Sequence, residues 1–207
     1  MPLSLPDMIT PSHTQNKKMS QLITRRWALP ARIMHAIGIF LMFALILHGW
    51  WMTVMVADDK QFAHLVWHGS FGYSMLLLVV LRLAWRGNTV APPLPPETLK
   101  WERNLAALSQ IGIYFLTLGM AFQGWALAGT FDQSLDARLL GLIPMPMIMS
   151  GTELHAPLVE MHSRFAWMLA GLVLIHIMAA GYHHFHKKDK LLARMFWESK
   201  GQEKESE

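Results

Sequence analysis

Apolar residues dominate four long stretches of this chain, and nearly all of the charged residues lie between them. The four stretches cover residues 33–57, 62–81, 105–129 and 162–182. Each is close to the ~20 residues that an α-helix needs to cross the hydrocarbon of a bilayer. The first stretch follows a polar segment and is too long for the core of a cleavable signal, so we expect it to stay in the mature protein. The pattern predicts an all-α fold, an integral membrane four-helix bundle.

The composition supports this prediction, because 53% of the 207 residues are hydrophobic and only 15% are charged. The flanking segments are polar, which predicts a disordered tail at residues 1–24, a transmembrane domain at 25–197 and a charged tail at 198–207. The chain has no cysteine, so covalent haem attachment, iron–sulfur clusters and thiol chemistry are excluded.

Lysine and arginine are distributed unequally between the two sides of the predicted spans. Fifteen of the 18 basic residues lie in the two tails and in the loop before residue 105. The positive-inside rule therefore places both termini and the proline-rich loop at residues 91–96 in the cytoplasm. The positive excess faces anionic lipid, so it does not call for nucleic acid as a partner.

Two histidines share the last predicted helix. His162 and His176 are fourteen residues apart, which brings them within about 40° of one face and ~21 Å apart along the axis. The orientation puts His68 at the outer depth of His162, and His35 at the inner depth of His176. Neutral imidazole is a good axial ligand for haem iron, and helical bundles build such sites from facing helices. We therefore predict two stacked, noncovalent haem b groups, each held by two histidines.

Other residues near these ligands have two interpretations. Gly38, Gly69, Gly72 and Gly171 would leave room for a flat macrocycle, although tight helix packing uses the same residue type. Arg82 shares a face with His68 and lies ~21 Å further inward, beside the inner site, unless it extends to the interface. His64 would form a metal-binding face with His68 or a hydrogen bond at the outer haem edge. His48 is turned about 140° from His35, which predicts an interfacial position.

Taken together, these residues resemble the bacterial cytochrome b561 family, related to the cytochrome b subunits of nickel–iron hydrogenases. The resemblance covers residues 25–197. It rests on five features: His35, His68 within H-G-S-F-G, Arg82 fourteen residues later, the pair His162 and His176, and His183 and His184 seven and eight residues after that pair. It implies a four-helix diheme protein of the bacterial inner membrane that exchanges electrons with quinone. One member of the family is a superoxide oxidase, which takes electrons from superoxide outside and delivers them to ubiquinone.

The resemblance also implies a quinone site at the inner end. His183 would hydrogen-bond and protonate the quinone headgroup there, or it is a solvated histidine of the tail. Some family members have histidines at the start of the third helix, where this chain has Ala107 and Gln110. The predicted outer face holds three basic against six acidic residues, a poor match for steering anionic superoxide.

Three functions follow. The first is an oxidoreductase that passes electrons through an outer haem, held by His68 and His162, and an inner haem, held by His35 and His176, to quinone. Superoxide is one candidate donor, which would make the protein an enzyme of the superoxide:ubiquinone type. The second is a haem-bearing subunit of a larger complex that takes electrons from a periplasmic redox protein. The third is a transporter or sensor whose histidines bind zinc, copper or another metal. The apolar, methionine-rich segment 139–151 would lie on the membrane surface as a lid, or dock the protein partner.

Overall fold

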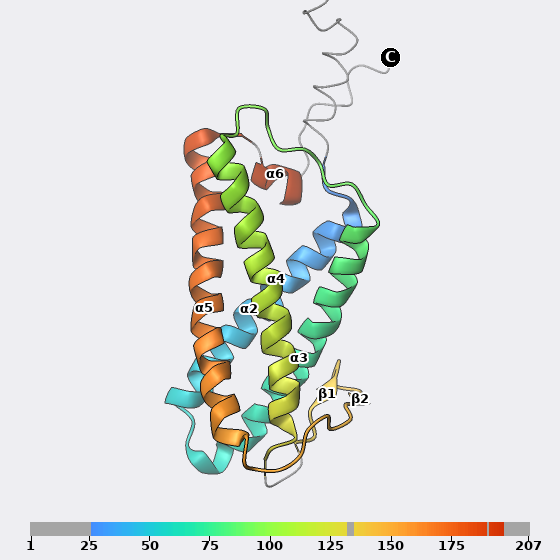
Figure 1. Ribbon diagram of the computed structural model, residues 1–207, viewed down its shortest axis with the longest axis vertical. Helices are drawn as coiled ribbons and strands as arrows, with labels where there is room; N and C mark the ends of the chain where they lie inside the picture. The colour runs from blue at the N-terminus through green and yellow to red at the C-terminus, as the bar shows by residue number, and fades with distance from the viewer. Residues whose placement is uncertain (1–25, 132–134, 190, 197–207) are drawn as a thin grey trace, which may run out of the picture.

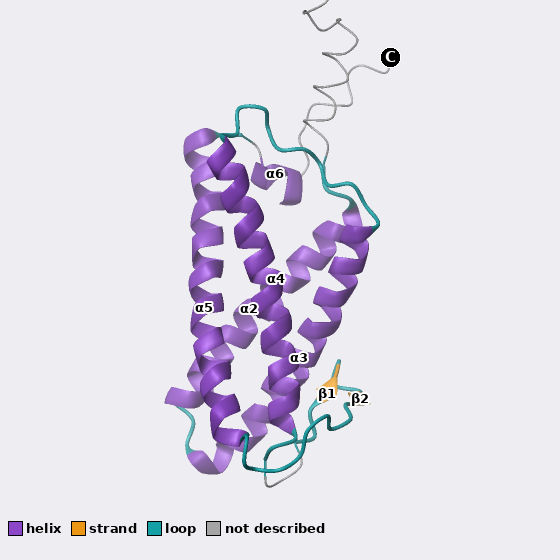
Figure 2. Cartoon of the chain, in the orientation of Figure 1, coloured by secondary structure: helices purple, strands orange, loops and turns teal. Residues whose placement is uncertain are grey.

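The computed structural model describes residues 26–131, 135–189 and 191–196, and four long helices make up most of this part (Figures 1 and 2). Each is long and apolar enough to cross a membrane. The predicted all-α membrane bundle is therefore confirmed, whereas the tails predicted at 1–24 and 198–207 lie outside the described residues. The helices are α2 (Leu29–Val54), α3 (Asp58–Gly87), α4 (Lys100–Ala128) and α5 (His155–Tyr182).

The helices are longer than the apolar stretches that predicted them. α3 begins four residues before its stretch and ends six residues after it, and α5 begins seven residues early. Apolar side chains are needed only near the hydrocarbon, whereas backbone hydrogen bonding continues into the polar regions on either side. α2 begins with a proline in its first turn, where the missing N–H costs nothing.

The helices pack in chain order, α2 on α3, α3 on α4 and α4 on α5. α2 crosses the bundle obliquely in Figure 1, behind α4 and from the upper end of α3 toward the lower end of α5. The backbones of α2 and α5 make few close contacts or none. The two helices that carry His35 and His176 are therefore held mainly by their neighbours.

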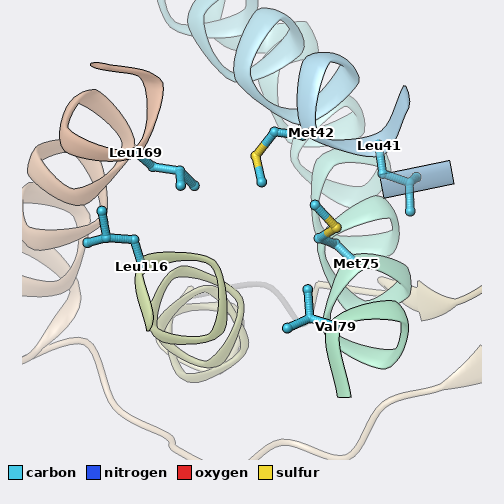
Figure 3. Close-up of a cluster of buried hydrophobic side chains, with 6 residues drawn as sticks. All are labelled: Leu41, Met42, Met75, Val79, Leu116 and Leu169. Carbon is cyan, nitrogen blue, oxygen red and sulfur yellow. The ribbon is translucent and has the colours of Figure 1, made fainter. Parts of the chain in front are cut away.

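A cluster of buried apolar side chains holds the middle of the bundle together (Figure 3). Leu169 of α5 belongs to it and lies seven residues from both His162 and His176. Seven residues are about two helical turns, so Leu169 lies near the face of both histidines and halfway between them. The cluster therefore separates the two predicted ligand levels. Its members are Leu41, Met42, Met75, Val79, Leu116 and Leu169.

Smaller elements cover the two ends of the bundle. We call the end with the loop 88–99 the inner end and the opposite end the outer end, following the predicted orientation. The outer end has an antiparallel hairpin of β1 (Arg138–Leu139) and β2 (Ile143–Pro144). At the inner end, α5 continues as the π-helix η2 (His183–Lys187), and the short α6 (Leu191–Phe196) follows.

α6 is tied to the inner end by two arginine side chains. Arg32 of α2 donates from Nε to the carbonyl of Met195 at 2.9 Å. Arg194 donates from Nη1 to the carbonyl of Pro93 at 2.9 Å. The segment after α5 therefore folds back across the bundle toward α2 and the proline-rich loop.

Candidate functional site

The outer pair of predicted ligands comes together between α3 and α5. The ring centres of His68 and His162 are 6.2 Å apart, with the ring planes at 75°. This spacing suits two imidazoles that share one metal ion, since two metal–nitrogen bonds of ~2 Å and the two ring radii add up to about 6 Å. The structure therefore brings the two side chains to a distance that matches their predicted role.

Neither imidazole of this pair has a hydrogen bond to a described residue, and the Nδ1 atoms of both His68 and His162 are buried without a partner. Buried polar atoms in native proteins are nearly always satisfied, so each such atom calls for an explanation. A metal-bound group between the rings would occupy one nitrogen of each ring. This observation fits the haem that the sequence predicts.

Two glycines on other helices lie against these rings. A Cβ atom on Gly49 of α2 would lie 3.1 Å from Cε1 of His68, and one on Gly124 of α4 would lie 3.3 Å from Cε1 of His162. Both distances are tighter than an ordinary van der Waals contact, so each ring packs directly on a helix backbone. Sequence analysis did not identify either glycine, because neither lies on the helix of the ligand that it contacts.

The glycines predicted beside the ligands have different surroundings. A Cβ on Gly69 would meet the loop residue Ala137 at 2.9 Å, so Gly69 serves the packing of the outer loop. A Cβ on Gly38 would make an ordinary contact with Leu78. Gly72 and Gly171 would meet no atom within 4 Å. Only these last two leave space beside the helix of the kind that a flat macrocycle needs.

Gln123 of α4 is a further residue that sequence analysis missed. Its side chain is buried, and neither amide atom has a hydrogen-bond partner among the described residues. It precedes Gly124, so it lies at the level of the outer pair. A buried, unpaired amide is costly, and a polar group of a bound cofactor would satisfy it. No sequence motif marks this glutamine.

The inner pair gathers at the other level. His35 of α2 is half-buried and His176 of α5 is exposed, and the two lie within electrostatic range of each other and of Arg82. The guanidinium of Arg82 lies 5.8 Å from the ring centre of Tyr114. The ring of Phe196 in α6 lies 5.9 Å from that of His35. The structure therefore brings Arg82 to the inner pair, and α6 covers His35.

The structure brings His48 to the histidines of α3, and its predicted interfacial position stays a prediction. Its Nε2 lies 3.2 Å from Nδ1 of His64, and its ring centre is 6.0 Å from that of His68. The ring of Trp51 stacks on His48. Because α2 crosses the bundle obliquely, its two ends present different faces to the interior, and the 140° between His35 and His48 allows both to point inward.

His183 lies at the junction of α5 and the π-helix η2. Its Nδ1 is in hydrogen-bond contact with Oδ2 of Asp189, and both side chains are mostly buried. One turn further on, Lys187 pairs with Glu102 at the start of α4. His183 is therefore held in a polar cluster at the inner end, which does not match a freely solvated histidine of the tail.

Among the described residues, no group of three or more histidine, aspartate or glutamate side chains is arranged to hold a metal ion. A haem iron needs only two protein ligands, because the macrocycle supplies the other four. Histidines paired between membrane helices, in a chain without cysteine, are typical of b-type membrane cytochromes.

Comparison with known proteins gives the same class. The chain belongs to the prokaryotic cytochrome b561 family, whose profile matches residues 26–198. It is 26% identical to cytochrome b561 homolog 2 of Escherichia coli K12 over 165 residues, which is 79% of this chain and 86% of that protein. It is 27% identical to homolog 1 of the same strain over 128 residues, 62% of this chain and 72% of that one. A probable superoxide oxidase CybB of Yersinia pestis is 28% identical over 134 residues, 65% and 75% of the two chains.

Family membership confirms the predicted family and the general nature of the protein. It is a membrane cytochrome of the oxidoreductase and electron-transport type that binds haem b. It therefore functions in a lipid environment with redox partners.

Proposed function

We propose that the chain holds two haem b groups, the outer one by His68 and His162 and the inner one by His35 and His176. We further propose that it carries electrons across the bacterial inner membrane from a periplasmic donor to ubiquinone, with both termini in the cytoplasm. The observation that carries this proposal is the pair of histidines on α5, fourteen residues apart: the ring of His162 lies against that of His68, and His176 lies within electrostatic range of His35. A bound haem b supplies a one-electron couple at its iron.

The side chains around each pair would orient it and set its charge. Gly49 and Gly124 hold the outer imidazoles against helix backbones, and Gln123 offers a hydrogen bond at that level. Arg82 places a positive charge beside the inner pair, where it would stabilise a propionate and added electron density.

An open cleft between α3 and α4 at the inner end supports a quinone site. Its volume is about 390 Å³, and a smaller neighbouring cleft includes Arg82 and shares three residues with it. Quinone headgroups need a mainly apolar site with a few polar groups to fix their orientation. Arg86, Gln110 and Tyr114 provide such groups in both clefts. We propose that the ubiquinone headgroup binds here, close to Arg82, which lies beside the inner histidine pair.

His183 is proposed to act in proton supply rather than in headgroup contact, because it does not line either cleft. Its contact with Asp189 fixes the orientation of the ring. Reduction of ubiquinone to ubiquinol consumes two protons, and an imidazole oriented by a carboxylate is a common carrier of protons in enzymes. Replacing Gln110 by Leu should raise the KM for quinone, whereas His183→Gln should lower kcat and leave KM unchanged.

Superoxide is the proposed donor because one relative is named a probable superoxide oxidase. One observation favours the alternative, a haem-bearing subunit with a protein donor. Arg138 pairs with Asp136 and Arg164 pairs with Glu160, so two of the three predicted outer cations are neutralised locally. A neutralised surface steers a small anion weakly.

Haem quantitation and superoxide reduction test both parts of the proposal. Purified wild type should contain two haem b per chain, and His68→Ala and His35→Ala should each contain one, while His64→Ala should keep both. Rapid reduction of the wild type by enzymatically generated superoxide, abolished by superoxide dismutase, would establish the donor. A haem content that neither ligand substitution changes would refute the assignment. Slow reduction by superoxide, with a redox protein that co-purifies in equal amount, would establish the subunit function instead.

A further inference from the structure

We propose that the β1–β2 hairpin at the outer end is inserted into the hydrocarbon of the outer leaflet, where lipid acyl chains cover it. Figure 1 shows the two strands beside α3, some distance from the outer tip of the bundle. The proposal concerns a contact with lipid and does not depend on the haem ligands or the electron donor.

Hydrogen bonds to two serines fix the depth of the hairpin. The backbone N–H of Arg138 donates to Oγ of Ser70 at 3.0 Å, and that of Leu140 donates to Oγ of Ser74 at 3.2 Å. Both serines belong to the membrane-spanning part of α3. The hairpin is therefore attached to the side of a span and not to the loops at its end.

Two tryptophans mark where α3 enters and leaves the hydrocarbon. Trp67 and Trp85 are eighteen residues apart, or ~27 Å along a helix, which matches a hydrocarbon core of about 30 Å with tryptophan at both interfaces. On this scale Ser70 lies ~5 Å and Ser74 ~10 Å below the outer interface. The tip of the hairpin, next to Ser74, is therefore inside the outer leaflet.

The backbone N–H groups of the hairpin meet one requirement for such a position, which is that donors in hydrocarbon have partners. The N–H groups of Gly141 and Leu142 bond to the carbonyls of Arg138 and Leu139, both at 3.1 Å, and Pro144 has no N–H. Each serine hydroxyl also donates to a carbonyl of its own helix, Ser70 to Val66 and Ser74 to Ser70. Each serine hydroxyl therefore accepts a hydrogen bond from the hairpin backbone and donates one to the backbone of α3.

The side chains follow the same depth profile. Leu140, Leu142 and Ile143 at the tip are exposed, and Leu142 is 75% accessible. Residues 139–151 contain no charge. The charged pair of Arg138 and Asp136 lies at the base of the hairpin, at the level of Ser70 and nearest the headgroups. A surface that is apolar at depth and charged at the interface matches the lipid beside it and no aqueous partner.

Site-directed labelling tests this placement cleanly, because the chain has no cysteine of its own. Leu142→Cys and Ile143→Cys would each be labelled with an environment-sensitive fluorophore in full-length protein, reconstituted into phosphatidylcholine–phosphatidylglycerol vesicles. Met168→Cys, on a 57% exposed site in the middle of α5, is the control for lipid. Val90→Cys, on an 86% exposed site in the proline-rich loop, is the control for water. Haem content of each labelled variant would report folding.

The hairpin labels should behave like the label at Met168. Acyl chains that carry nitroxide groups should quench them, and a water-soluble quencher should act on them at least tenfold less than on the Val90 label. If both hairpin labels instead match the Val90 label in protein that keeps its haem, the hairpin lies in water and the proposal is overturned. If one labelled variant loses its haem, the result of the other decides the outcome. If both lose it, nitroxide quenching of Trp125 fluorescence decides it, because the Trp125 side chain donates to the carbonyl of Pro146 next to the hairpin. Trp125→Phe is the control for that measurement.

Discussion

Replacing Gly49 by alanine should disturb the outer haem alone. The added Cβ would lie 3.1 Å from Cε1 of His68, against 3.4–4 Å for an ordinary contact, so the ring must move by a few tenths of an ångström. Forcing a side chain off its rotamer costs about 0.5–1.5 kcal/mol. If this strain weakens the bond to ferric iron, it raises the one-electron potential of the outer haem by about 20–60 mV, since 59 mV corresponds to 1.4 kcal/mol.

Redox titration of the purified protein, followed in the haem absorption bands, measures this shift. The matched control is Gly38→Ala on the same helix, where the added Cβ makes an ordinary contact at 3.6 Å. We expect the control to leave both potentials within a few millivolts of wild type. Equal shifts in the two alanine variants, or a shift confined to the inner haem after Gly49→Ala, would refute the contact between Gly49 and an outer ligand.

Three further outcomes are expected. Gly72→Leu should lower haem content if a macrocycle lies beside Gly72, where an added side chain meets no protein atom. Gly87→Leu, at a site equally free of contacts, should not lower it. Equal haem content in the two variants would argue against a macrocycle beside Gly72. Arg82→Gln should lower the potential of the inner haem by tens of millivolts and spare the outer one, because a cation stabilises added negative charge; redox titration decides this. Gly129→Ala should loosen the outer loop, because its Cβ would lie 1.9 Å from the Met149 carbonyl; limited proteolysis should show faster cleavage there than in Gly87→Ala.

The four spans and the meeting of His68 with His162 could be predicted from the sequence, because hydrocarbon thickness sets the length of a span and helical periodicity sets the level of a residue along it. Helix crossing angles leave no such signal. That is why the contacts of His48 with His64 and His68 were not predicted, and why Gly49 and Gly124 were not recognised as neighbours of His68 and His162. Crossing angles depend on how whole helix surfaces fit together.

The outer hairpin shows a second limit. Its turn places Leu140 and Gly141 at positive φ, where the usual residues are Asn or Asp followed by Gly. Because Leu140 replaces the usual Asn or Asp, the sequence carries no turn signal here, although a leucine suits a tip that faces lipid. The segment 139–151 could be recognised as apolar, but its pairing depends on the hydroxyls of Ser70 and Ser74, sixty-six residues or more away in the chain.

The apolar cluster between the two histidine levels (Figure 3) has a consequence for energy conversion. None of its six side chains can take up or release a proton, so electrons that cross this layer would do so without protons. Each electron that moves fully inward would transfer one negative charge across the membrane, against ~2.3 kcal/mol for every 100 mV of an inside-negative potential. In the proposed orientation, membrane voltage would therefore oppose the reaction, and a collapse of the voltage should accelerate it.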